Sequence, residues 1–98
     1  MPRIPTRTKP DKQRQFLQEQ EAALADFAAP DNWTDSNNRA NSIWRDIEDA
    51  RLSIFLQSNG YWSWCIARAG GHRTYASTGF EDIGDACFNL ARELGVIA

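Results

Sequence analysis

The stretch from Arg51 to Ser77, RLSIFLQSNGYWSWCIARAGGHRTYAS, decides the fold. Its first residues alternate between polar side chains and Leu, Ile or Phe, a pattern typical of a strand. Asn59-Gly60 is the strongest short hairpin signal, and Gly70-Gly71 predicts a second turn. The stretch therefore predicts a three-stranded antiparallel sheet, with strands over about 51–57, 61–68 and 73–77.

Helical patterns flank this stretch on both sides. Residues 11–29 are rich in good helix formers and repeat apolar residues at helical spacing until Pro30. Residues 80–94 carry a second apolar stripe, preceded by a capping box of Thr78 and Glu81 and followed by Gly95. The expected fold class is α+β, with the sheet packed by an N-terminal helix over about 11–29 and a C-terminal helix over about 80–94.

The segment between the first helix and the sheet gives a weaker signal. Residues 31–42 are rich in Asn, Asp and Ser, which favour turns. In residues 43–49, Ile43 and Ile47 are four apart, a spacing that suits a helix and also one face of a strand. Because three of these seven residues are acidic and acidic residues are poor strand formers, we favour a short helix.

The loop of the first hairpin fixes which side chains share a face, since a one-residue shift moves a whole strand face across the sheet. A two-residue turn at Asn59-Gly60 leaves an aromatic set on the face away from Leu52, Ile54 and Leu56. That set is Phe55, Trp62, Trp64, Ile66 and, with a second two-residue turn, Tyr75. A three-residue loop, Ser58-Asn59-Gly60, instead puts Trp62, Trp64 and Ile66 together with Leu52, Ile54 and Leu56.

The three-residue loop is favoured because a small domain needs its large apolar side chains inside. With the two-residue turn, the aromatic face needs the first helix, a second subunit or a partner to cover it.

Composition and charge describe one acidic body with a basic arm. With 98 residues, 42% hydrophobic and 24% charged, the chain fits a single globular domain over residues 11–98. Residues 1–14 contain five basic residues and one acidic, a net charge of +4, whereas the rest contains six basic and twelve acidic, a net of −6. We expect residues 1–10, with three prolines, to form a flexible basic arm. The start has no secretion signal and no apolar run long enough for a membrane span, so a cytoplasmic protein is expected.

Reactive groups are few. His72 is the single histidine, and Cys65 and Cys87 are too far apart in sequence to form a metal or redox motif. The two cysteines are expected to be buried free thiols. The acidic residues near the start of the last helix are explained by the helix dipole. We therefore expect no enzyme activity, no catalytic residues, no metal and no cofactor.

The order of elements over residues 11–94, a helix, three strands and a helix, resembles the double-stranded-RNA-binding domain. That family binds phosphates through lysines at the start of its last helix. The matching stretch here is Glu81-Asp82-Ile83-Gly84-Asp85, which repels phosphate. The resemblance therefore covers element order only, and the family's function does not transfer.

The favoured interpretation is a non-catalytic protein-binding module that docks on a larger protein, such as a nucleic-acid-handling protein with a basic surface, or on a second copy of itself. By class analogy in size and charge alone, it is similar to small phage or plasmid anti-defence inhibitors such as anti-CRISPR proteins. Expected partner-binding residues are the aromatics Trp62, Trp64, Phe55 and Tyr75 and the acidic residues Asp46, Glu48 and Asp49. The alternative is weak nucleic-acid binding through Arg3, Arg7, Lys9, Lys12 and Arg14 together with sheet aromatics.

Overall fold

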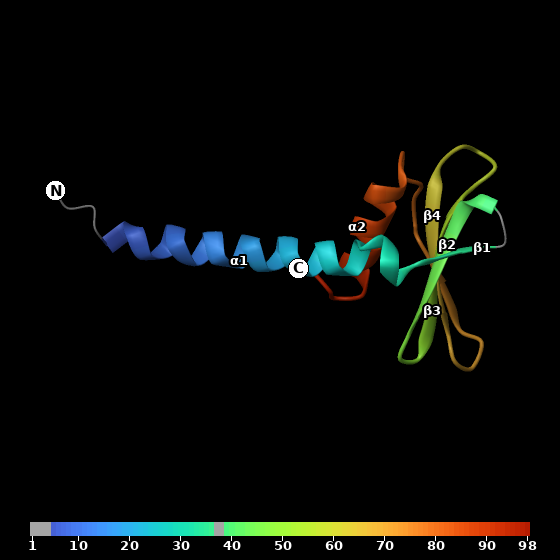
Figure 1. Ribbon diagram of the computed structural model, residues 1–98, viewed down its shortest axis with the longest axis horizontal. Coiled ribbons are helices and arrows are strands. Elements are labelled where there is room, and N and C mark those ends of the chain that lie inside the picture. Colours follow the sequence, from blue (N-terminus) through green and yellow to red (C-terminus); the bar gives the residue numbers. More distant parts are fainter. Residues whose placement is uncertain (1–4, 37–38) are drawn as a thin grey trace.

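The computed structural model describes residues 5–36 and 39–98 and has an α+β architecture. The sheet is antiparallel and five-stranded, and its strands follow one another in chain order, β1-β2-β3-β4-β5. Figure 1 shows both helices on one side of this sheet, so that its other side is open. The elements are α1 (Pro5–Ala28), the 3-10 helix η1 (Pro30–Asn32), β1 (Thr34–Ser36), β2 (Arg39–Ile47), β3 (Ala50–Leu56), β4 (Trp62–Arg68), β5 (Arg73–Tyr75) and α2 (Ile83–Glu93).

The hairpin between β3 and β4 adopts the three-residue loop. Ile54 lies opposite Trp64, and the amide of Gly60 donates a 3.0 Å hydrogen bond to the carbonyl of Gln57. Gly60 has a φ of 89°, a left-handed conformation that residues other than glycine rarely adopt. This register puts Trp62 and Trp64 on the face that the helices cover, as the favoured arrangement predicted.

The expectation of three strands was wrong in number, because β1 and β2 precede the predicted meander. Residues 43–47 belong to β2 and form no helix. Ile43, Arg45 and Ile47 pair with the inward-facing positions of β3, so the four-residue spacing marks one face of a strand. The acidic residues that argued against a strand lie where a strand tolerates them: Asp46 is exposed on the open side, and residues 48–49 form the turn to β3.

The predicted turn region, residues 31–42, is also more regular than expected. It holds the end of η1, the short strand β1 and the start of β2. The register of β1 against β2 shifts between Asp35 and Ser36, which marks an irregularity at this sheet edge. The polar composition therefore marks an edge strand and its turns.

The core lies between the sheet and the helices. Its fully buried centre consists of Leu52, Ile54, Ile66 and Leu90. Trp64 is 3% exposed and donates a 2.8 Å hydrogen bond from its indole nitrogen to Oδ1 of Asn89 on α2. This bond satisfies the buried indole N–H and connects the sheet to the helix.

The last helix starts later than the sequence predicts. Its N-cap is Asp82, whose carboxylate accepts a 2.8 Å hydrogen bond from the amide of Asp85. The predicted capping box of Thr78 and Glu81 is therefore wrong, because Phe80 is still paired with Trp62 in an isolated bridge. Gly95 has a φ of 80° beyond the end of the helix, which confirms the predicted stop.

The first helix starts earlier than predicted, and Phe27 near its C-terminal end anchors it in the core. It begins at Pro5, within the segment expected to be a flexible arm, and a proline is compatible with the first helical position. Phe27 is 6% exposed in the core, and its carbonyl accepts hydrogen bonds from the Trp33 indole and the Arg45 guanidinium. Towards the N-terminus, α1 extends away from the sheet and α2, which gives the molecule its length of 61 Å (Figure 1).

Candidate interaction surface on the open side of the sheet

The open side of the sheet carries a set of residues that we call the outer face. Alternation of side chains along the strands assigns them, because their neighbours in sequence point into the core. One row of this face crosses four strands, where Trp44 lies opposite Ser53, Ser53 opposite Cys65, and Cys65 opposite Tyr75. The outer face consists of Trp44, Asp46, Arg51, Ser53, Phe55, Ser63, Cys65, Ala67, Arg73 and Tyr75.

Aromatic and small residues alternate across the outer face. Tyr75 is 56% exposed, and Trp44 and Phe55 are half-buried. Ser63 and Cys65 are buried although no helix covers them, so their larger neighbours on the same face shield them from water. The result is a surface of aromatic rings over small residues, a composition typical of protein interfaces.

Next to this aromatic surface lies an ion pair. Arg51 on β3 bonds both carboxylate oxygens of Asp46 on β2, at 2.7 and 3.1 Å. Its guanidinium also lies 4.0 Å from the ring centroid of Trp44. The hydrogen bonds from Arg51 lower the pKa of Asp46 below its ordinary value. Because both charged groups are exposed, the ion pair contributes little to stability. Its main effect is to hold the Trp44 ring in position beneath the guanidinium.

The residues predicted to bind a partner separate into three places. Phe55, Tyr75 and Asp46 lie together on the outer face. Trp64 is in the core, and Trp62 is half-buried on the same inner side. Trp62 and Trp64 therefore lie on the opposite side of the sheet from Phe55 and Tyr75, because the three-residue loop turns them inward.

The acidic positions Glu48 and Asp49 are exposed in the turn between β2 and β3. Oδ2 of Asp49 lies 3.7 Å from the Arg68 guanidinium, a long and exposed ion pair. These two residues lie at the end of the hairpin that also carries Asp46, beside the outer face.

Trp44 was missed as a candidate because residues 43–49 were expected to form a helix. The signal that finds it is the alternation of Ile43, Arg45 and Ile47 with Trp44 and Asp46, which is a two-residue period. Arg51 and Arg73 were missed because a single arginine in a strand carries no motif.

The basic residues of the nucleic-acid alternative lie at the opposite end of the molecule. Arg7, Lys9, Lys12 and Arg14 belong to the N-terminal part of α1, and Arg3 lies outside the described residues. Arg14 is exposed. Because these residues and the outer face are on different sides of the core, they do not form one surface (Figure 1).

Comparison of the chain with protein-family models, with curated proteins and with solved structures gave no match. Within residues 5–36 and 39–98, no three His, Cys, Asp or Glu side chains are grouped so that they could hold a metal ion. In the same part of the chain, no helix has the length and apolar character needed to cross a membrane.

Proposed function

We propose that this protein is a non-catalytic binding module that docks another protein through the outer face. The observation that carries the proposal is the set of aromatic side chains on the open side of the sheet, where Tyr75 is exposed and Phe55 and Trp44 are half-buried. Both helices cover the inner side of the sheet, so Tyr75, Phe55 and Trp44 contribute nothing to the packing of the helices. Aromatic side chains left on an open sheet face are typical anchors of protein interfaces.

Charge indicates the kind of partner. Residues 15–98 carry a net charge of −6, and the exposed acidic residues Glu48 and Asp49 lie beside the outer face. A partner with a basic surface and an apolar depression for the Tyr75 ring fits both features. Proteins that handle nucleic acids have such basic surfaces, so we propose this class of partner.

A photo-crosslinking experiment tests the proposal. We replace Tyr75 with p-benzoylphenylalanine in the full chain and irradiate cells of the native host. The matched control carries the same crosslinker in place of Phe88, an exposed aromatic residue on α2 that is 44% exposed. We expect one protein to crosslink at position 75 and not at position 88. Replacement of Phe55 by Ser in the crosslinking chain should weaken that product, because it removes a neighbouring anchor.

Two outcomes contradict the proposal. Equal crosslinking of the same protein, other than a second copy of this chain, at positions 75 and 88 would show that the outer face has no special role. Capture of nucleic acid alone would favour the alternative, for which the basic sequence of residues 1–14 is the supporting observation. A titration with a single-stranded oligonucleotide then distinguishes the two, since phosphate binding weakens steeply with salt and requires residues 1–14.

A further inference from the structure

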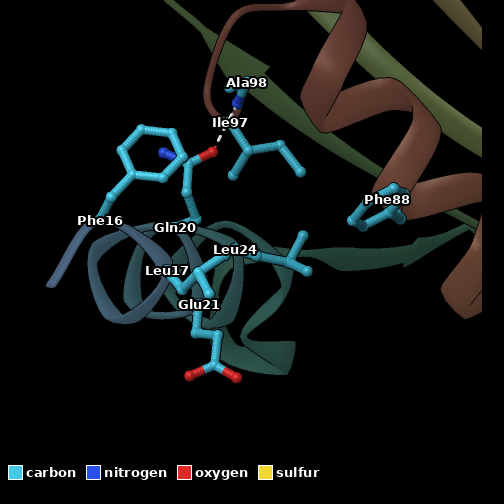
Figure 2. A pocket seen from close by; sticks show the side chains of 8 residues that line it. All are labelled: Phe16, Leu17, Gln20, Glu21, Leu24, Phe88, Ile97 and Ala98. Atoms are coloured by element: carbon cyan, nitrogen blue, oxygen red, sulfur yellow. Dashed lines mark hydrogen bonds between the residues drawn. The ribbon is translucent and has the colours of Figure 1, made fainter. Parts of the chain in front are cut away.

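A groove lies between α1 and the C-terminal part of the chain, on the opposite side of the core from the outer face. Figure 2 shows its lining of Phe16, Leu17, Gln20, Glu21, Leu24, Phe88, Ile97 and Ala98, and its volume is about 360 Å³. Phe16 and Leu17 are 50% and 61% exposed, and Phe88 is 44% exposed. Three large apolar side chains that are 44% to 61% exposed at one place indicate a surface that another molecule covers.

The charges of α1 are the reverse of those that stabilise a single helix. Residues 5–14 contain four basic residues and one acidic residue, a net charge of +3, whereas residues 15–28 contain three acidic residues and no basic residue. The helix has no acidic residue in its first turn and no basic residue in its last turn. A helix dipole favours the opposite distribution, so the dipole of α1 gives no reason for these charges.

Pairing with a second copy of the same helix explains this distribution of charges along α1. The basic and acidic parts of α1 meet at Phe16 and Leu17, close to the middle of the helix. When two copies run antiparallel and cross there, the turn with Lys12 and Arg14 in one copy lies beside the turn with Glu19 and Glu21 in the other. A twofold axis repeats this pairing, so that each basic part lies along an acidic part.

The length of α1 also favours pairing with a second copy. The helix is 24 residues long, and Phe16 is the residue nearest its N-terminus that lines the groove. The remaining turns extend past the body (Figure 1). Helices in proteins gain most of their stability from packing, and antiparallel pairing would lay these turns along the groove of the second copy.

We propose that α1 is a self-association helix, through which two copies of this chain pair antiparallel with Phe16 and Leu17 at the crossing. The inference is independent of the proposed function, because the dimer uses the helix side of the molecule and leaves both outer faces free. A dimer of this kind presents two docking surfaces, which raises the avidity for a partner that has repeated sites.

Light scattering of the full chain during size-exclusion chromatography tests the pairing. We expect the mass to rise from 11.1 kDa to twice that value as the concentration increases. Leu17→Asp should raise the dissociation constant by at least about 30-fold, since the two-fold axis brings two new carboxylates into an apolar contact. Gln18→Asp is the matched control, because it adds the same charge to an exposed neighbouring position of α1 away from the groove lining. Far-UV circular dichroism shows that each variant is folded.

Charge reversal tests the antiparallel register. Lys12→Glu with Arg14→Glu makes the turns on both sides of the crossing acidic, and Glu19→Lys with Glu21→Lys makes both of these turns basic. We expect each double variant to be monomeric alone, and an equal mixture of the two to form a heterodimer.

A wild-type chain that stays at 11.1 kDa up to about 1 mM would overturn the proposal. Dimers of either double variant as stable as the wild-type dimer would overturn the antiparallel register. In a parallel pair, like charges lie opposite one another in the wild type and in both double variants. The comparison of these three homodimers therefore separates the two orientations.

Discussion

Cys87 shows how surroundings determine the chemistry of one residue. Its side chain is 8% exposed among core residues of α2, and it forms no disulfide. Burial raises the pKa of the Cys87 thiol, and the positive charge of Arg45 opposes this effect only in part. Since the thiolate is the reactive form, a buried neutral thiol is inert. The expectation of buried free cysteines is confirmed by both residues.

We predict that Cys87 reacts with a thiol reagent only when the protein unfolds. In a Cys65→Ser chain at pH 8, Ellman's reagent should react slowly with the folded protein and rapidly after unfolding in guanidinium chloride. Because the folded pKa is raised, the stability due to the neutral thiol is complete below the unfolded pKa, about 8.5, and is lost as the pH rises above it. The free energy of unfolding should therefore fall above that pH in this chain and less in Cys65→Ser/Cys87→Ala. Rapid reaction in the folded state would contradict the prediction.

Trp44 and Trp64 show what a strand face does to a residue type. Both are tryptophans in strands, yet Trp64 is buried with its indole bonded to Asn89, and Trp44 lies on the outer face under Arg51. Because both residues have the same side chain, residue type alone does not distinguish them. Only the register of the strands separates a core residue from a candidate anchor.

At the scale of the element, the start of α2 depends on one carboxylate. Asp82 accepts the amide hydrogen of Asp85, and its own backbone is extended, as an N-cap requires. The sequence pattern placed the cap at Thr78 because Thr and Glu three residues apart form a capping box. The bridge between Phe80 and Trp62 keeps residue 80 attached to the sheet, so the helix cannot begin there.

We predict that Asp82→Ala lowers the free energy of unfolding by about 1 kcal/mol. Asp82→Ser should retain most of the stability, since a serine hydroxyl also caps. Thr78→Ala serves as the control and should have little effect, because Thr78 is exposed and does not cap the helix. Urea denaturation of the three variants measures the differences. A larger loss for Thr78→Ala than for Asp82→Ala would contradict the assignment of the cap.

At the scale of the whole molecule, Phe27 joins three elements. Its ring contacts Trp33 edge to face, with 5.7 Å between ring centroids, and the Arg45 guanidinium lies 5.3 Å from its centroid. Its carbonyl accepts hydrogen bonds from both of those side chains. The end of α1, the segment after η1 and strand β2 are therefore held at one point.

We predict that Phe27→Ala destabilises the protein by about 3–5 kcal/mol, as expected for a buried phenylalanine. Phe27→Leu keeps part of the volume and should cost less, so it is the variant to use if Phe27→Ala does not fold. Phe16→Ala is the matched control on the same helix, since Phe16 is half exposed. Thermal unfolding at a concentration where the chain is monomeric measures the loss of stability in each variant, which should be largest for Phe27→Ala. Equal losses for Phe16→Ala and Phe27→Ala would contradict the anchoring of α1 at its C-terminal end.

The sequence alone determined the meander from Arg51 to Ser77, the two flanking helices and the burial of the cysteines. It could do so because local periodicity and turn residues specify these features over a few positions. The sequence also separated a basic N-terminal part from an acidic remainder, and it predicted the protein-binding function and the nucleic-acid-binding alternative.

Only the tertiary structure decided that residues 39–47 form a strand and that Trp44, and not Trp62 or Trp64, lies on the outer face. It also showed that the apolar residues in the middle of α1 line an exposed groove. These features depend on pairing between segments far apart in the chain, and a four-residue spacing fits both a helix and a strand until the partner strand is present.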